Sequence, residues 1–184
     1  IKIGPEGKQF EFGQETVMFR HEEKFRRPSG IAVRIPAALS DDEVSARVEQ
    51  INNSTFMRVG KTLKVQFSAV ELDGVADPAG LAKFVASKSK VPLILIGNKV
   101  DAMQAAVEAI KADRPLVYKA DASNIEGFSQ IAAAAKTPLA VSGTSIEELA
   151  DLTTKARVNK VEEVVLAFKG DNFGETIRAL TIAR

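Results

Sequence analysis

Four apolar runs decide the fold of this sequence: Leu93-Ile94-Leu95-Ile96, Leu116-Val117-Tyr118, Leu139-Ala140-Val141 and Val164-Val165-Leu166-Ala167-Phe168. The runs recur about every 23 to 26 residues, close to the length of one β/α unit. The segments between them predict helices that begin near Asp101, Asn124, Ser145 and Phe173. Short apolar strands that alternate with amphipathic helices predict a parallel sheet whose outer face is covered.

The same alternation extends toward the N-terminus. Ile31-Ala32-Val33-Arg34-Ile35 has the β-branched content of a strand, and Pro36 ends it. Ser40 and Glu43 form a capping-box pattern at the start of a helix whose apolar stripe is Val44, Val48 and Ile51. A strand is predicted from Thr62 to Leu72, and Asp77-Pro78 predicts the start of the next helix.

The first thirty residues have a different pattern. Gln9 to Gly13 and Thr16 to Arg20 alternate apolar and polar side chains, as half-buried strands do. We therefore predict a short antiparallel hairpin that turns near Gly13.

Six β/α units can be counted, whereas a closed barrel needs eight and typically about 250 residues. The sequence thus predicts an α/β fold of the (β/α)8 TIM-barrel type, incomplete, with about two units missing. It divides into an N-terminal hairpin segment, residues 1–30, and a partial barrel, residues 31–184. The absence of a starting methionine suggests a fragment or a processed chain. A doubly wound open sheet is the alternative, because it also suits six strands.

Composition narrows the functional classes. The chain has 184 residues, 25 basic and 24 acidic side chains, and a formal net charge of +1. Such a balance provides no single-sign field to attract nucleic acid or an anionic membrane, so neither partner is predicted. Because cysteine is absent, disulfides, thiolate zinc sites and iron–sulfur ligation within this stretch are excluded, and a reducing, cytoplasmic location is expected.

One motif suggests a GTPase. Asn98-Lys99-Val100-Asp101 follows an apolar strand, as the guanine-binding motif does, and Gly60-Lys61-Thr62 resembles the end of a phosphate-binding loop. However, Thr55 occupies the position of the first loop glycine, and Thr62 is expected to open a strand rather than a helix. The motif therefore does not predict a nucleotide site.

The single histidine, His21, lies among charged side chains without a second metal ligand or a nucleophile. A structural or solvated role is expected for it. Arg20, Arg26 and Arg27 could bind a phosphate or the acidic groups of a partner, but a solvated loop is the favoured interpretation.

In a barrel, functional side chains gather where strands end and the β/α loops begin. The polar residues at these positions are Glu71, Asp73, Asn98, Asp101, Lys119, Asp121, Ser142, Thr144, Lys169, Asp171 and Asn172. Capping or solvation explains most such residues, with Asp77, Asp101, Asn124 and Ser145 as expected caps. No catalytic residue and no metal ligand is predicted. Asn98, Asp121 and Asn172 are the candidates for binding a cofactor such as a pterin ring.

Three stretches resemble one family, the large (gamma) subunit of the corrinoid iron–sulfur protein of the acetyl-CoA decarbonylase/synthase (CO dehydrogenase/acetyl-CoA synthase) complex. They are Gly13 to Phe25 with Pro28 and Ile31-Ala32-Val33 after it, Arg58 to Leu63, which is similar to the start of a barrel strand, and Gly174 to Arg184, which is similar to a late helix. The resemblance covers nearly the whole chain.

The resemblance implies a three-part subunit with a cysteine-rich [4Fe–4S] domain, a central barrel and a corrinoid (cobalamin) domain. This chain corresponds to the barrel only, so the segment is expected to bind no cofactor itself. The full protein would carry a methyl group from methyltetrahydrofolate or methyltetrahydropterin to acetyl-CoA synthase in one-carbon metabolism and carbon fixation. Its implied partners are the small subunit, a methyltransferase and acetyl-CoA synthase.

Within that scheme, the barrel is expected to dock the small subunit and the corrinoid domain rather than to catalyse methyl transfer. Two alternatives stay open. The chain could be a pterin-binding barrel methyltransferase, suggested by the Asp and Asn side chains at strand ends, or a structural barrel without a ligand.

Overall fold

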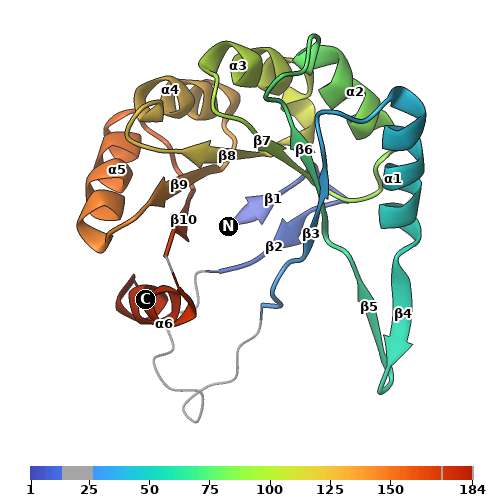
Figure 1. Ribbon diagram of the computed structural model, residues 1–184, viewed down its shortest axis with the longest axis horizontal. Helices are drawn as coiled ribbons and strands as arrows, with labels where there is room; N and C mark the ends of the chain where they lie inside the picture. Colours follow the sequence, from blue (N-terminus) through green and yellow to red (C-terminus); the bar gives the residue numbers. More distant parts are fainter. Residues whose placement is uncertain (14–26, 171, 184) are drawn as a thin grey trace.

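A curved parallel sheet with helices outside it forms the body of the protein (Figure 1). The computed structural model describes residues 1–13, 27–170 and 172–183. The strands are β1 (Lys2–Ile3), β2 (Phe10–Glu11), β3 (Ala32–Ile35), β4 (Thr55–Arg58), β5 (Lys61–Lys64), β6 (Phe67–Glu71), β7 (Leu93–Ile96), β8 (Leu116–Ala120), β9 (Leu139–Gly143) and β10 (Val164–Phe168). The helices are α1 (Asp41–Asn53), α2 (Pro78–Lys88), α3 (Val100–Ala109), the 3₁₀ turn Lys111–Asp113, α4 (Ile125–Ala135), α5 (Ile146–Val158) and α6 (Phe173–Ala183).

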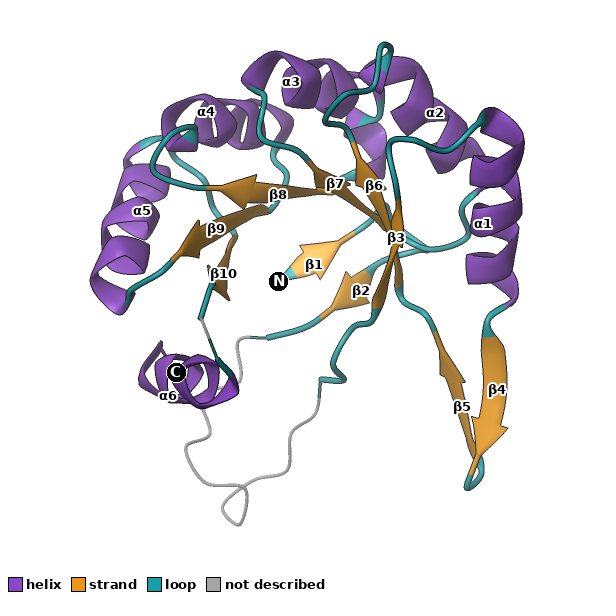
Figure 2. Ribbon diagram, in the orientation of Figure 1, coloured by secondary structure: helices purple, strands orange, loops and turns teal. Residues whose placement is uncertain are grey.

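The order of the strands distinguishes the two predicted architectures. The six-stranded sheet runs β10-β9-β8-β7-β6-β3, so each strand pairs with the sheet strand that precedes or follows it along the chain, always in parallel. A doubly wound sheet reverses its direction of growth and places helices on both faces. Here α1 to α5 all lie outside the arc of strands (Figure 2). The incomplete TIM-type barrel is confirmed, and the doubly wound alternative is wrong.

Alternation along the strands divides the core into two clusters. Ile35, Val70, Leu95, Val117 and Leu139 are aligned across neighbouring strands, and all five are buried in the cluster that packs against the helices. Residues of opposite parity face the concave side, where Phe67, Leu116 and Ala140 form a second cluster. The apolar content of the strands is high because both faces are covered.

The concave side is filled by the N-terminal hairpin. β1 and β2 pair antiparallel, and Ile3 and Phe10 pack on the second cluster (Figure 1). The Phe10 and Phe67 rings meet edge to face, with centroids 5.1 Å apart. Gly4, at φ +101°, lies close to Pro92: a Cβ added at Gly4 would come within 2.8 Å of Pro92 Cγ.

An N-terminal antiparallel hairpin was predicted and is present. Its observed pairing joins Lys2 to Glu11 and Ile3 to Phe10, so the chain turns between Ile3 and Phe10 and not near Gly13 as predicted. The expected second strand, Thr16 to Arg20, lies outside the described residues.

The predicted strand from Thr62 to Leu72 is wrong as one element. Its first part belongs to β5, which folds back antiparallel on β4, and its second part is β6, which enters the parallel sheet. Val59 and Gly60 have positive φ angles of 47° and 72°, and this turn reverses the chain. Arg58 to Leu63 is therefore a hairpin tip and not the start of a barrel strand.

Most predicted helix starts are confirmed, but two of the predicted caps are wrong. Ser40 and Glu43 form the predicted capping box, and Asp77 and Ser145 accept the backbone N–H groups of Gly80 and Glu148. Asp101 lies inside the first turn of α3 and does not cap it. Asn124 precedes α4 but makes no side-chain cap, because its side chain bonds to Asp121 in its own loop and to Asn98 in the loop after β7.

Candidate functional site

The carboxyl ends of the parallel strands and the loops after them form one rim of the barrel, which we call the C-terminal rim. In a barrel this is the face where side chains from many strands can meet a ligand. The opposite end is closed by the N-terminal hairpin: Gly4 N–H donates to the Arg114 carbonyl, and Lys8 Nζ donates to the Ser89 carbonyl. The rim is therefore the natural place to look for a site.

A hydrogen-bond network, the rim network, connects the loops after β6, β7 and β8. The carboxylate of Asp73 accepts from the Asn98 backbone N–H at 3.0 Å and from Asn98 Nδ2 at 2.7 Å. Asn124 Nδ2 donates to the Asn98 carbonyl at 3.3 Å, and Asn124 Oδ1 accepts from the Asp121 N–H at 2.8 Å. Asn124 is buried, so this central amide holds two loops together with its donor and acceptor both used.

Two of the three candidate residues belong to this network, and the third does not. Asn98 and Asp121 are joined through Asn124. The Asp121 carboxylate also accepts from the Ser123 N–H at 2.9 Å, which fixes its own loop. Asn172 lies before α6 and accepts the Glu175 N–H at 2.9 Å, as a helix cap does. The structure therefore brings Asn98 and Asp121 together and leaves Asn172 apart.

The first turn of α5, which follows β9, carries a further carboxylate that sequence reasoning missed. Glu148 Oε2 accepts from the Thr144 N–H at 2.7 Å and from Thr144 Oγ1 at 2.9 Å. These bonds, chiefly the one from the backbone, hold the pKa of Glu148 below its ordinary value of 4.5, although the charge of Asp121 opposes the shift. The spacing of Ser145 and Glu148 matches a capping pattern and could have identified the residue.

A pH dependence of stability follows from Glu148. A carboxylate whose pKa is lower in the folded state stabilises the fold above its unfolded pKa, and this contribution is lost as the pH falls through the folded pKa. We expect Glu148→Gln to unfold with a weaker pH dependence than the unchanged protein between about pH 6 and pH 3, as measured by urea unfolding at each pH. Glu147→Gln, which changes the neighbouring residue of α5, is the control. Equal pH dependence in Glu148→Gln and the unchanged protein would contradict the assignment.

Other predicted rim residues have local roles. Glu71 forms an ion pair with Arg34, with Nε and Oε1 3.2 Å apart, and accepts from the Ala37 N–H. Ser142 is buried, and the Lys169 N–H donates to the Gly143 carbonyl. Arg27 pairs with Glu11 at 2.8 Å, so it is held in place rather than solvated. Asp171, His21, Arg20 and Arg26 lie outside the described residues.

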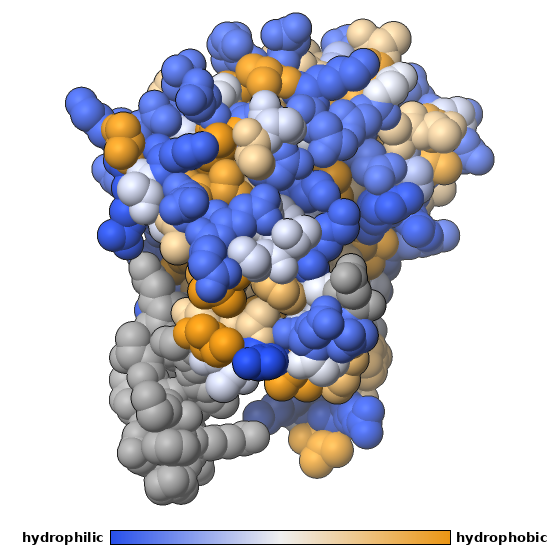
Figure 3. Space-filling view, turned by 60° about the vertical axis from the view of Figure 1, so that its left-hand side comes forward, coloured by the Kyte–Doolittle hydropathy of each residue, from blue (hydrophilic) through white to orange (hydrophobic). Residues whose placement is uncertain are grey.

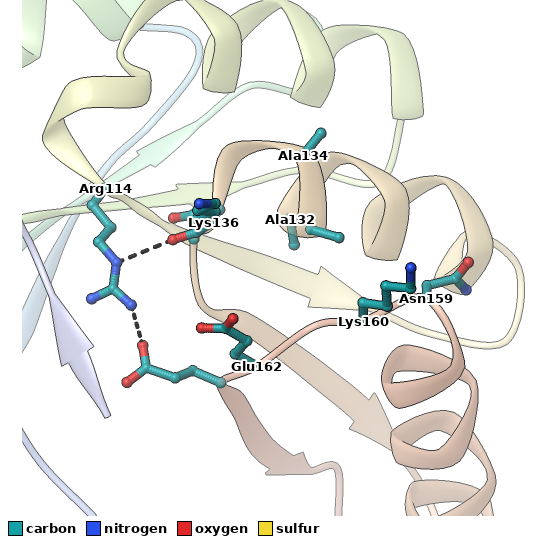
Figure 4. Close-up of a pocket in the computed structure, with 10 residues that line it drawn as sticks. Arg114, Ala132, Ala134, Lys136, Asn159, Lys160 and Glu162 are labelled. Carbon is teal, nitrogen blue, oxygen red and sulfur yellow. Dashed lines mark hydrogen bonds and ion pairs between the residues drawn. The ribbon is translucent and has the colours of Figure 1, made fainter.

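A cavity of about 360 Å³ lies at the other end of the barrel, where α4 and α5 lead into β9 and β10 (Figure 4). Lys136, Asn159, Lys160 and Glu162 line it, together with the alanines of the last turns of α4. Arg114 borders it and donates to the Lys2 carbonyl at 2.6 Å, to the Lys136 carbonyl at 3.1 Å and to Glu163. Since the guanidinium is occupied by these three partners, we assign Arg114 a structural role.

The chemistry available at the rim is hydrogen bonding by amides and carboxylates. No group of three or more His, Cys, Asp or Glu side chains suited to a metal ion occurs within residues 1–13, 27–170 and 172–183. Within the same residues, no helix has the length and apolarity that crossing a membrane requires. Glu71 and Asp73 already accept hydrogen bonds from a neighbouring loop, whereas Asp121 and Glu148 accept them from their own.

Comparison with known proteins gives a consistent result. The whole chain, residues 1–184, matches the family described as CO dehydrogenase/acetyl-CoA synthase delta subunit. It is 34% identical over 158 residues to the corrinoid/iron-sulfur protein large subunit of Moorella thermoacetica, with 84% of this chain and 35% of that protein aligned. It is 29% identical to the acetyl-CoA decarbonylase/synthase complex subunit gamma of Methanothermobacter thermautotrophicus, with 100% of this chain and 41% of that protein aligned. The chain thus spans well under half the length of these relatives.

Proposed function

Because the chain belongs to the CO dehydrogenase/acetyl-CoA synthase delta subunit family, we propose that it is the barrel part of a corrinoid iron–sulfur methyl carrier. The family description says delta subunit, whereas the aligned relatives are named large subunit and subunit gamma. We follow the relatives, since each name belongs to one sequence aligned along most of this chain. The full-length protein would act in the cytoplasm, taking a methyl group from methyltetrahydrofolate or methyltetrahydropterin and passing it to acetyl-CoA synthase.

The share of this chain in that function is docking. A [4Fe–4S] cluster is held by cysteine thiolates, and the chain has none, so its residues do not fit the cluster. We propose that the corrinoid is held by another part of the full-length protein. We propose that residues 31–184 dock the small subunit and the corrinoid domain, with residues 1–30 as a separate N-terminal segment.

The observation that carries the docking role is the apolar surface at the β10 side of the sheet. Phe173, Ile177 and Leu180 share one face of α6 at helical spacing, and all three are exposed. Leu166 of β10 is exposed as well. Hydrophobic side chains gather in the lower part of the face in Figure 3, whereas the surface above is mostly hydrophilic. An apolar helix face of this extent is typical of a surface that another domain or subunit covers.

The rim network supports a second candidate, a barrel that binds a pterin. Asn98 and Asp121 have the hydrogen-bonding groups that a pterin ring requires. Against it, the Asn98 amide N–H already donates to Asp73 and the Asp121 carboxylate already accepts from Ser123, so a ligand would have to displace these bonds.

A binding experiment on the full-length protein separates the two candidates. Without a methyltransferase, we expect calorimetry to detect no binding of methyltetrahydrofolate, and when methyltransferase is added we expect the cobalt of the protein to become methylated. A pterin-binding barrel would bind the donor alone and lose at least about tenfold in affinity in Asn98→Ala or Asp121→Ala, since each removes one polar contact. Asn159→Ala, at the opposite end of the barrel, is the control. Donor binding that these rim variants weaken would overturn the docking proposal.

A further inference from the structure

The β4–β5 hairpin extends away from the body of the protein (Figure 1), and it has no core of its own. All ten residues from Thr55 to Lys64 are exposed. Four of them are large apolar side chains, namely Phe56, Met57, Val59 and Leu63, and Val59 at the tip is 94% exposed. A two-stranded ribbon that buries nothing is marginally stable by itself.

The register shows how the side chains of the ribbon are arranged. Directly paired residues of an antiparallel ribbon share a face. Phe56 pairs with Leu63, and Arg58 pairs with Lys61. These two pairs have the same parity, so one face has an apolar pair near the base and a cationic pair near the tip. Met57 and Thr62 lie on the other face.

Several residues of the β4–β5 hairpin are unfavourable for the stability of an isolated ribbon. Arg58 and Lys61 are like charges in directly opposed positions, which destabilises a ribbon. Between Thr55 and Lys64 there are three basic residues and no acidic residue. No ion pair involving Arg58, Lys61 or Lys64 is formed among the residues that the structure describes. The tip residue Val59 is β-branched at φ +47°, where Asn or Gly is favoured.

An external partner accounts for these features together. Carboxylates placed opposite Arg58 and Lys61 would remove their repulsion, and an apolar groove would cover Phe56 and Leu63. Phe, Met and Arg are enriched in the centres of protein–protein interfaces. Nucleic acid fits less well, because the large apolar side chains on both faces of the ribbon would stay uncovered and the whole chain has a net charge of only +1.

We propose that the β4–β5 hairpin is a docking element for another protein subunit, which receives it in an apolar groove bordered by carboxylates. The ribbon follows α1 and precedes β6, so it lies at the end of the barrel opposite the C-terminal rim. A partner bound there leaves the rim accessible. The inference depends on the hairpin alone and stands whether or not the methyl-carrier proposal is correct.

Site-specific photo-cross-linking tests the proposal. In the full-length protein, a photoreactive phenylalanine analogue replaces Phe56, or Val158 as an exposed control on α5. The protein is irradiated in extract of its source organism, and the linked peptide is identified by mass spectrometry. We expect position 56 to link to a different polypeptide, at an apolar segment flanked by Asp or Glu, and position 158 not to link there.

The charged pair provides the second part of the test. Arg58→Gln/Lys61→Gln should reduce the yield of that cross-link at least about tenfold, because it removes the two charges that face the carboxylates. Lys155→Gln/Arg157→Gln, which removes two exposed charges from α5, should leave the yield unchanged. The melting temperature of Arg58→Gln/Lys61→Gln should be unchanged or higher, since the repulsion within the ribbon disappears.

Four results would overturn the proposal. They are linkage to another copy of this chain, linkage to a segment of the same molecule, linkage to nucleic acid or lipid, and a yield at position 56 no greater than at position 158. A cross-link that persists unchanged in Arg58→Gln/Lys61→Gln would equally reject the carboxylate-bordered groove.

Discussion

Phe67→Ala should lower the free energy of unfolding by about 3 to 5 kcal/mol, the range measured when a large aromatic side chain is removed from a core. Phe67 is 4% exposed and contacts both Phe10 and Phe12, with ring centroids 5.1 and 6.3 Å apart. Phe67 belongs to β6 and packs with residues of the N-terminal hairpin, so its removal leaves a cavity between the sheet and that hairpin. Urea unfolding followed by circular dichroism measures the change.

Phe56→Ala is the matched control for this prediction. It makes the same chemical change on the exposed β4–β5 hairpin, where the side chain is 60% exposed. We expect its effect on stability to stay within about 0.5 kcal/mol. A double-mutant cycle between Phe10→Ala and Phe67→Ala should give a coupling of about 0.5 to 1.5 kcal/mol for the edge-to-face pair. Equal effects of Phe67→Ala and Phe56→Ala on the free energy of unfolding would show that the N-terminal hairpin does not pack on the sheet as described.

Arg114→Ala should destabilise the protein by about 2 to 3 kcal/mol, because it leaves a partly buried carboxylate and two carbonyls without their donor. The three partners of the guanidinium belong to β1, to the end of α4 and to the segment before β10. One side chain therefore ties the N-terminal hairpin to two separate β/α units. Thermal unfolding and amide hydrogen exchange of β1 and β2 measure the loss.

Two further variants examine the cause of this effect. Arg157→Ala removes an exposed arginine from α5 and should change stability by less than about 0.5 kcal/mol. Arg114→Lys keeps the charge but not the planar fork that reaches three acceptors, so an intermediate loss is expected. If Arg114→Ala lowered the free energy of unfolding no more than Arg157→Ala, the three hydrogen bonds of Arg114 would contribute nothing to stability.

The repeat of apolar runs was sufficient to predict the architecture. Four of the sheet strands, β7 to β10, were located from Leu93, Leu116, Leu139 and Val164 onward, and each begins at that residue. Apart from the exposed Leu166 of β10, the apolar residues of these strands are buried or half-buried on both faces, so an apolar run identifies them. The family resemblance was likewise visible in the sequence and is confirmed by the match of residues 1–184.

Prediction was less accurate where the apolar pattern does not report burial. Leu63 is apolar and β-compatible but exposed, and this joined β5 to β6 in a single predicted strand. Two residues with positive φ, Val59 and Gly60, separate the elements, and valine gives no signal for such a turn. The tip of the hairpin was thereby mistaken for part of a barrel strand.

The candidate site was only partly predictable for a related reason. Polar residues at strand ends were identified as a class, but their partners lie far away in sequence: Asp73 and Asn98 are 25 residues apart, and Asn98 and Asn124 are 26 apart. Asn124 was expected to cap α4, and instead it connects two loops. Arg114 has no motif around it, so nothing in its neighbourhood indicates three distant acceptors.

The sequence by itself determined the α/β class, the positions of β7 to β10 and the family, because these depend on periodicity and local chemistry that recur along the chain. It favoured the barrel and an N-terminal hairpin, but the strand order and the hairpin pairing came from the structure. Tertiary structure alone decided which strand-end residues meet, that Arg114 bonds the N-terminal hairpin to the segments after α4 and before β10, and that the β4–β5 hairpin is exposed. The physical reason is that hydrogen-bond partners and burial depend on the curvature of the whole sheet, which brings together residues that no local pattern relates.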